Sequence, residues 1–226
     1  MSHTPPSKTV YFVRHGQDEQ GSHEYFQTAE SPLTSLGEEQ ARFVAERCAT
    51  LKLDLLVSSP MVRAMKTAEV IAGATGLSVV SSALFREYLA PTSLRGQTRA
   101  TETGRTYVAQ MLDHFGDADW HFEDEDNYFD LHARAIEALQ FLLDRPEQDI
   151  LVVTHAGFLR ALITAMMTEG EPDARLTRML MRFLKPMNTG ISVCHYHPEE
   201  SRRNHWRLVS WNDHAHLAEV DLEEPL

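Results

Sequence analysis

Short apolar runs alternate with longer segments of helical periodicity along most of this chain. Four runs are rich in β-branched and large apolar residues and end in turn residues, which predicts buried strands at 9–13, 54–58, 77–81 and 149–154. Apolar residues recur at helical spacing in the other segments, at 34–51, 60–72, 128–144, 158–168 and 176–184. Strands that alternate with helices predict an α/β fold, a three-layer αβα sandwich with a mainly parallel central sheet.

The C-terminal part of the pattern differs, because two strand-like runs follow each other without a helix between them. They span 191–197 and 205–211 and are joined by a short polar segment at 198–204. Consecutive strands with a short connection pair in antiparallel fashion. We therefore expect an antiparallel pair near the C-terminus.

Turn and capping residues predict where two of the helices begin and end. Ser35 opens a capping-box pattern, with Thr34 as a competing N-cap of the same helix. Pro60 suits the first position of the next helix. Gly73 and Gly76 predict the end of that helix.

The segment 88–127 interrupts the periodic pattern with glycines, polar residues and an acidic tract at 117–126. A loop of this length inside a compact domain is usually functional. We interpret it as a partly helical insertion, a lid over a site, within a single domain that spans 1–226. The acidic tract is most simply a solvated loop, and its alternative role is to screen out highly anionic substrates.

Composition narrows the classes of function. The chain has 226 residues and a formal net charge of −12, which argues against a general binder of nucleic acid or of anionic membranes. The polar N-terminus lacks the apolar core of a signal peptide, and no apolar stretch is long enough to span a membrane, so we expect a cytoplasmic protein. Its two cysteines, Cys48 and Cys194, are interpreted as reduced packing residues. The sequence leaves the oligomeric state open, a homodimer included.

Histidines and arginines follow three of the predicted strands at their C-terminal ends. The three groups are Arg14-His15-Gly16, then Ser58-Ser59-Pro60 with Arg63 one helical turn later, and His155-Ala156-Gly157. Ligands of open α/β sheets bind at this edge of the sheet. The three strand ends are therefore candidates to form one pocket that contains two arginines and two histidines.

This combination of side chains suits the transfer of a phosphoryl group. Arginine offers a fixed fork of donors that matches phosphate geometry and keeps its charge. A histidine nucleophile must be neutral to attack, and neighbouring arginines favour the neutral form by lowering its pKa. A phosphohistidine intermediate divides one difficult displacement into two easier ones.

The order of these motifs resembles the histidine phosphatase superfamily, the phosphoglycerate mutase-like enzymes, whose hallmark is an Arg-His-Gly turn after the first strand. Further matching features, in chain order, are Pro32-Leu33-Thr34 with Gly37, Ser58-Ser59-Pro60 with Arg63, Ala64, Thr67 and Ala68, Glu87, Thr154-His155-Ala156-Gly157, Asn188-Thr189-Gly190, and Trp211-Asn212 through His216-Leu217. The resemblance spans 9–217 with a gap over 90–127.

The resemblance implies a role for each matching residue. His15 would carry the phosphoryl group, and Glu87 would be the general acid that protonates the leaving oxygen. The residues implied to bind the phosphate are Arg14, Gly16, Gln17, Arg63, His155 and the backbone of Ala156. The resemblance implies no metal and no organic cofactor, and a small phosphorylated metabolite as the partner.

Departures from the mutase pattern make a phosphatase for small phosphomonoesters the preferred function. The Arg-His-Gly turn is followed by Gln17-Asp18-Glu19-Gln20-Gly21, which lacks the mutases' asparagine, and Asp18 adds a negative charge or is simply a turn residue. The segment after Glu87 lacks the mutases' basic pattern. The alternatives are a mutase-type phosphotransferase and a non-catalytic phosphate-binding protein.

A second cluster of histidines lies near the C-terminus. Its members are His195, His197, His205, His214 and His216. A metal site is one interpretation of such a cluster, but no pair has clear ligand spacing with a supporting cysteine. Strand alternation or surface placement explains these residues as well.

Overall fold

A central sheet organises the chain in the computed structural model, which describes residues 6–21, 24–198 and 205–217. Within these residues the sheet has six strands in the order β3-β2-β4-β1-β5-β6. The strands are β1 (Lys8–Arg14), β2 (Leu55–Ser58), β3 (Val79–Ser81), β4 (Asp149–Thr154), β5 (Ile191–Tyr196) and β6 (Trp206–Asp213). The first four are parallel, whereas β5 runs antiparallel to both β1 and β6. The predicted parallel sheet and antiparallel C-terminal pair are confirmed.

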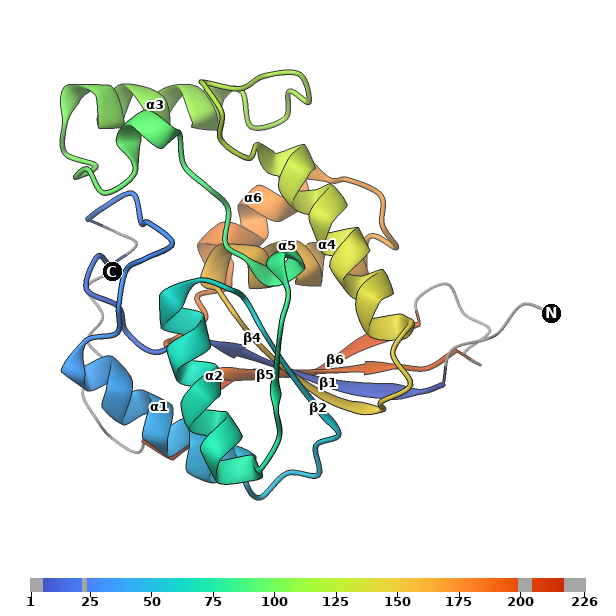
Figure 1. The fold of residues 1–226 in the computed structure, drawn as a ribbon. Helices are drawn as coiled ribbons and strands as arrows, with labels where there is room; N and C mark the ends of the chain where they lie inside the picture. Colours follow the sequence, from blue (N-terminus) through green and yellow to red (C-terminus); the bar gives the residue numbers. More distant parts are fainter. Residues whose placement is uncertain (1–5, 22–23, 199–204, 218–226) are drawn as a thin grey trace.

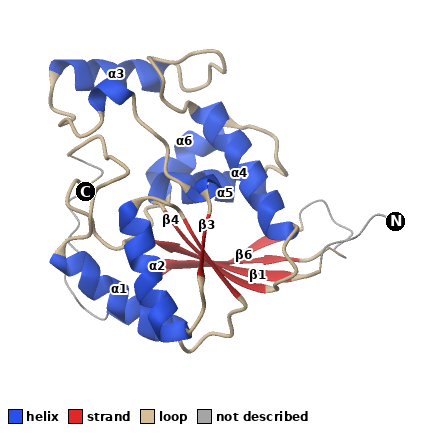
Figure 2. Cartoon of the chain, in the orientation of Figure 1, coloured by secondary structure: helices blue, strands red, loops and turns tan. Residues whose placement is uncertain are grey.

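Helices cover both faces of this sheet (Figures 1 and 2). Their bounds are α1 (Ser35–Cys48), α2 (Val62–Thr75), α3 (Glu102–Asp113), α4 (Tyr128–Leu143), α5 (Ala156–Met167) and α6 (Ala174–Phe183). One buried cluster joins α4 and α5 to the sheet and another joins α1 and α2 to it. No helix in the described parts of the chain has the length and apolar character required to cross a membrane.

Strand β1 illustrates why the sequence folds this way. Val10 and Phe12 belong to the cluster with α4 and α5, whereas Val13 belongs to the cluster with α1 and α2. Successive side chains of a strand point to opposite faces, so an apolar run serves two layers at once. Cys48 and Cys194 are free and buried within these clusters, and burial raises the pKa of each thiol to about 12.

The helix ends correct several predictions. Thr34, not Ser35, is the N-cap of α1, and its hydroxyl accepts a hydrogen bond from Gly37 N at 3.0 Å. Helix α2 begins at Val62 behind the N-cap Met61, so Pro60 lies before the helix. Gly73 lies inside α2, which continues to Thr75. The chain leaves α2 at Gly76, whose φ of 75° is the left-handed conformation that glycine tolerates.

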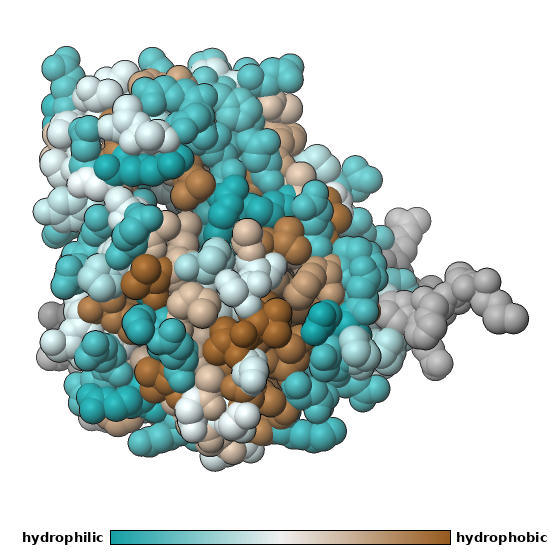
Figure 3. Space-filling view, in the orientation of Figure 1, coloured by the Kyte–Doolittle hydropathy of each residue, from teal (hydrophilic) through white to brown (hydrophobic). Residues whose placement is uncertain are grey.

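The segment 88–127 contains α3 and a short 3₁₀ turn, so its expected partial helicity is confirmed. It packs around a third buried cluster, formed by Phe26, Ala90, Leu94 and Tyr107. Hydrophilic residues dominate its outer surface in the space-filling view (Figure 3). Tyr107, Val108 and Met111 of α3 pack in this cluster, whereas Leu112 is exposed.

The acidic tract is not a solvated loop throughout. Asp126 is paired with Arg86 at 2.5 Å and with Arg134 at 3.3 Å. Glu125 is buried, and its carboxylate accepts hydrogen bonds from the backbone N–H groups of Phe122 and Glu123. The simple interpretation is wrong at these two residues, because arginines from other segments pair with Asp126 and backbone donors of the tract itself bind Glu125.

Candidate active site

The ends of β1, β2 and β4 meet at one edge of the sheet. Arg14 lies opposite Thr154 in the parallel β1–β4 register, and Ser58 lies opposite Val153 in the β2–β4 register. The residues that follow these strands therefore meet at the carboxyl edge, as predicted. The backbone N–H of His15 donates to Thr154 O at 3.0 Å, which fixes the direction in which the chain leaves β1.

The His15 ring is buried and held in one tautomer. Its Nδ1 lies 2.7 Å from Gly16 O, and a carbonyl oxygen can only accept, so Nδ1 carries the proton in the neutral ring. The lone pair is then on Nε2, which accepts a hydrogen bond from Arg63 Nε at 3.2 Å. The nucleophilic nitrogen thus faces a guanidinium group.

The environment of His15 favours the neutral ring. Burial holds its pKa well below the ordinary value of 6.5, and the charges of Arg63 and Arg14 lower it further. The effect of the arginines was predicted from the sequence. The larger effect of burial was not, because it depends on how completely the surrounding elements cover the ring.

His155 lies at the N-cap position of α5, and its ring is adjacent to the ring of His15. The two ring centroids are 5.0 Å apart, and His155 Nε2 is 2.7 Å from Ser59 Oγ. Burial, followed by the charge of Arg63, holds the pKa of His155 well below its ordinary value. Its Nδ1 is buried and has no hydrogen-bond partner among the described residues. Such an atom is a candidate contact for a ligand.

The turn after β1 requires glycine at position 16, and α1, which packs against this turn, requires glycine at position 37. A Cβ added to Gly16 would collide with Gly37 O, and one added to Gly37 would collide with Gln17 O. Gly16 N donates to Thr67 Oγ1 at 3.1 Å, and Asn188 Nδ2 donates to His15 O at 2.8 Å. Close packing against α1 and α2 therefore fixes the backbone that carries His15.

The two arginines approach the site from different elements. Arg63, in the first turn of α2, is 1% exposed, and its Nη1 donates to Thr28 O at 2.8 Å. Arg14, the last residue of β1, donates from Nη1 to Pro186 O at 2.7 Å. Both line a cavity of about 470 Å³, together with Glu87 and Ala156.

Glu87 is positioned by the start of α5. Its carboxylate accepts backbone hydrogen bonds from Gly157 and Phe158, both at 2.8 Å, and from Tyr88 at 3.0 Å. A Cβ on Gly157 would lie 2.6 Å from Glu87 Oε1, so only glycine leaves room for this carboxylate. The N-terminus of a helix favours a negative charge at this place.

The side chains of Gln17 and Asp18, the two residues after the Arg-His-Gly turn, have hydrogen-bond partners within the protein. The Gln17 side chain accepts a hydrogen bond from Thr34 Oγ1 at 2.8 Å and does not line the cavity. Asp18 is buried, and its carboxylate accepts hydrogen bonds from Gln27 Nε2 and Ser31 Oγ. These hydrogen bonds connect the turn after β1 to the segment 27–34 that follows it.

The sequence did not indicate Arg160 as a site residue. It follows His155 on α5, lines the cavity, and donates from Nε to Leu184 O at 2.7 Å. In the sequence it stood out only as a charge within an apolar stretch. Its spacing of four residues from Ala156, which puts both on one face of the helix, is the signal that could have indicated its place at the cavity.

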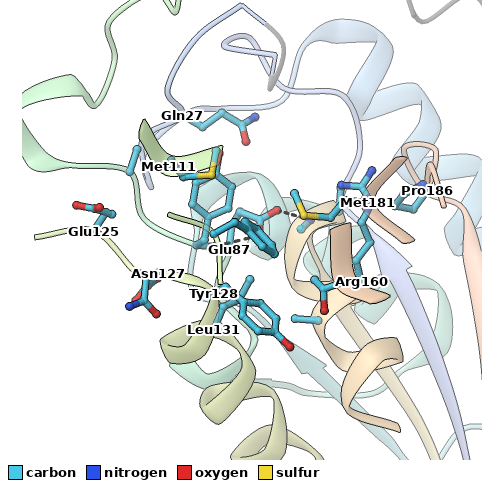
Figure 4. Close-up of a pocket in the computed structure, with 18 of the residues that line it drawn as sticks. Gln27, Glu87, Met111, Glu125, Asn127, Tyr128, Leu131, Arg160, Met181 and Pro186 are labelled. Atoms are coloured by element: carbon cyan, nitrogen blue, oxygen red, sulfur yellow. Dashed lines mark hydrogen bonds between the residues drawn. The ribbon is translucent and has the colours of Figure 1, made fainter. Parts of the chain in front are cut away.

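The cavity extends well beyond the arginines. Figure 4 shows Met111, Tyr128, Leu131 and Met181 around the space next to Glu87. These side chains come from α3, α4 and α6. The site therefore has one end formed by strand ends and another formed by helices.

The C-terminal histidines have local hydrogen bonds. His216 Nε2 is 3.1 Å from Thr189 Oγ1, and His214 Nδ1 is 2.8 Å from Asn212 O. Within residues 6–21, 24–198 and 205–217, no three or more His, Cys, Asp or Glu side chains form a group that could hold a metal ion.

Comparison with curated proteins finds relatives along nearly the whole chain. The probable phosphoglycerate mutase GpmB of Citrobacter koseri is 30% identical over 218 residues, which cover 95% of this chain and 97% of the relative. The protein of the same name from Serratia proteamaculans is also 30% identical over 218 residues, with the same coverage.

Solved structures share the fold. A mycobacterial glucosyl-3-phosphoglycerate phosphatase superposes with a TM-score of 0.73 at 25% identity, over 91% of this chain and 99% of that one. A phosphoserine phosphatase of Entamoeba histolytica gives a TM-score of 0.72 at 21% identity, over 93% and 99%.

The family assignment rests on the match over residues 10–214 to the model of the histidine phosphatase superfamily, branch 1. This range contains the Arg14-His15-Gly16 turn, Arg63, Glu87 and His155, all of which the fold brings to one end of the sheet. The chain belongs to the histidine phosphatase superfamily.

Proposed function

We propose that the protein hydrolyses phosphomonoesters through a phosphohistidine formed at Nε2 of His15. The observation that carries this proposal is the state of the imidazole: Nδ1–H is bound to Gly16 O, and Nε2 keeps its lone pair beside Arg63. A buried neutral histidine that meets a guanidinium group is suited to attack an anion that the same guanidinium binds.

In the first step the phosphate group binds between Arg14 and Arg63. Arg63 Nε then exchanges its hydrogen bond with His15 Nε2 for one with a phosphate oxygen, which exposes the lone pair. Nε2 attacks phosphorus, the N–P bond forms and the ester P–O bond breaks. Glu87 takes up a proton when the phosphate dianion binds beside it, and gives this proton to the leaving alcohol oxygen. His155 Nδ1 donates to the transferring group.

In the second step water attacks the phosphohistidine. Glu87, now a carboxylate, accepts a proton from the attacking water, the N–P bond breaks, and inorganic phosphate leaves. His15 returns to the neutral form and Glu87 to the acid. The two steps consume one water and release one alcohol and one phosphate, so the steps balance with these residues and water.

A mutase is the second candidate, because the relatives of highest identity among those described above carry that name. A mutase returns the phosphoryl group to another hydroxyl, and it excludes water from the site while the histidine is phosphorylated. The mycobacterial phosphatase, at 25% identity, and the absence of the mutase pattern after Glu87 support hydrolysis instead. Strict dependence on a bisphosphate primer would favour the mutase.

The test is the release of inorganic phosphate from a panel of phosphomonoesters by the parent, by His15→Ala, and by His205→Ala as a matched control on an exposed histidine. We expect release by the parent and the control without a primer, unchanged by EDTA, and none by His15→Ala. Equal release by His15→Ala and the parent would contradict the proposal. Loss of activity in EDTA would contradict the metal-free mechanism.

A further inference from the structure

The cavity is divided into a cationic end and an apolar end. The carbonyl oxygens of Leu184 and Pro186, which flank Lys185, accept hydrogen bonds from Arg160 and Arg14. Arg14 and Arg160 are therefore tied to the same loop, and Arg63 and Lys185 also line this end of the cavity. A phosphate group is neutralised here.

The opposite end is lined by apolar and aromatic side chains, which we call the aromatic chamber. Its members are Tyr107, Met111, Phe115, Trp120, Tyr128 and Met181. Phe115 stacks on Tyr128 with ring centroids 5.2 Å apart. In Figure 4, Met111 and Met181 lie on opposite sides of Glu87, with Tyr128 below it. Rings and thioethers form a surface that suits another ring.

The polar groups along the chamber are already bound within the protein. Asp126 is held by two arginines, and Glu125 by two backbone N–H groups. Gln27 Nε2 donates to Asp18, and Arg99 donates to Tyr88 Oη at 3.0 Å while it lies over the Phe26 ring. A polar substrate would find few groups here to replace its bound water, whereas an apolar one would lose no hydrogen bonds.

The volume of the cavity exceeds the needs of a phosphate group. About 470 Å³ lies in the range of cavities that take ligands of drug size. A phosphorylated three-carbon acid would leave most of the chamber filled with water. A ring system would instead displace that water from apolar walls, which is the main source of binding free energy in such sites.

Building on the phosphatase function above, we propose that the substrates are phosphomonoesters of bulky aromatic alcohols. The phosphate binds between Arg14 and Arg63, and the ring system fills the aromatic chamber. Segment 88–127 determines this preference, because it contributes four of the six chamber residues.

The first test compares two alkyl phosphates whose leaving alcohols are alike in acidity, so that a difference in kcat/KM does not come from the leaving group. Phosphate release from 2-(1-naphthyl)ethyl phosphate is measured against release from ethyl phosphate. We expect kcat/KM to be higher for the naphthyl compound by about tenfold or more, since a buried ring removes a large apolar area from water. Equal values would overturn the inference.

The second test uses two methionines of α6. Met181 lines the chamber, whereas Met179 lies on the same helix, is 58% exposed and does not line the cavity. Both side chains are partly exposed, so their removal leaves the core intact. We expect Met181→Ala to lower kcat/KM for the naphthyl compound about threefold to tenfold, and to lower it by a clearly smaller factor for ethyl phosphate. Met179→Ala should match the parent with both.

The outcomes separate this inference from the function on which it rests. Hydrolysis of both compounds at equal kcat/KM, or equal behaviour of Met181→Ala and Met179→Ala, would overturn the aromatic preference and leave the phosphatase in place. Release of phosphate by His15→Ala at the parent's rate would overturn the phosphatase, and the substrate assignment with it.

Discussion

The two ends of the cavity are built from different parts of the chain. At the cationic end, Arg14 and His15 lie at the end of β1 and His155 follows β4, while Arg63 and Arg160 lie near the starts of α2 and α5. At the aromatic end, the side chains come from α3, α4, α6 and the loops between them, and only packing brings them together. The chemistry is thus encoded locally, whereas the choice of substrate is encoded in tertiary contacts.

This difference predicts two kinds of mutational effect. Changes at the cationic end should affect all phosphomonoesters alike, because each presents the same phosphate group. Changes around the aromatic chamber should affect substrates according to the size of their organic part. The predictions below are ordered from the largest expected effect to the smallest.

Arg63→Lys should produce the largest effect. Lysine keeps the charge but loses the fork and the Nε contact with His15 Nε2. We expect kcat to fall by about 10²- to 10³-fold, the scale seen when one donor to a developing charge is lost. The fall should be equal for ethyl and naphthylethyl phosphates in steady-state phosphate release. Arg42→Lys, an exposed change on α1, is the control. A fall in kcat that differs between the two substrates would contradict the idea that the cationic end acts on the phosphate group alone.

The loss of kcat in Glu87→Gln should depend on the acidity of the substrate's leaving group and not on the size of its organic part. Without the acid, we expect kcat for alkyl phosphates to fall about 10²-fold. 4-Nitrophenyl phosphate should be much less affected, because its leaving group is stable as an anion. The matched control is Glu125→Gln, which changes a carboxylate that also lines the cavity. A similar loss with both leaving groups would remove Glu87 from the role of proton donor.

The buried histidines should make the cationic end sensitive to acid. His15 and His155 have pKa values well below 6.5 in the native protein, so the unfolded chain takes up protons below about pH 6.5 while the native protein does not. The free energy of unfolding should therefore contain the whole contribution of the two neutral histidines above that pH. As the pH falls from about 6.5 to 5, it should decrease by up to about 1.4 kcal/mol per pH unit for each histidine.

Urea unfolding at a series of pH values measures this dependence. His155→Gln should reduce the slope by about one proton. His205→Gln, on an exposed histidine, should leave it unchanged. A parent whose stability rises on acidification over this interval would contradict the assignment of neutral buried rings.

Asp126→Asn should give the smallest effect, confined to the aromatic end. The variant keeps an acceptor for Leu89 N but loses the ion pairs with Arg86 and Arg134. We expect the free energy of unfolding to fall by about 1–3 kcal/mol, since the two arginines are left partly buried. KM for naphthylethyl phosphate should rise a few-fold, with kcat for ethyl phosphate unchanged. Asp119→Asn, on the exposed part of the tract, is the control.

The cationic end could be predicted because its signals are local. A β-branched run predicts the buried strand β1, and the residues after it must leave the sheet at the carboxyl edge. The same reasoning located His155. Glu87 was found only through the resemblance, because nothing in its own neighbourhood distinguishes it from an exposed glutamate. Its contacts with Gly157 and Phe158 exist only after folding.

The aromatic end could not be predicted, for physical reasons that differ between residues. Tyr107 and Met181 are far apart in sequence, and no local pattern indicates that both face one cavity. Asp126 looked like part of a solvated tract, because its partners Arg86 and Arg134 come from other segments. Gly73 looked like a helix end, although α2 continues to Thr75, since a single glycine in a helix interior has only a modest cost.

The central claim is that His15 Nε2 carries the phosphoryl group during turnover. The most direct test is to mix the protein with an excess of substrate, quench within one turnover, and map phosphorylated peptides under alkaline conditions that preserve phosphohistidine. The account predicts phosphate on His15, formed at least as fast as inorganic phosphate appears. Phosphate release with no phosphorylated His15 at any time before the first turnover would contradict it.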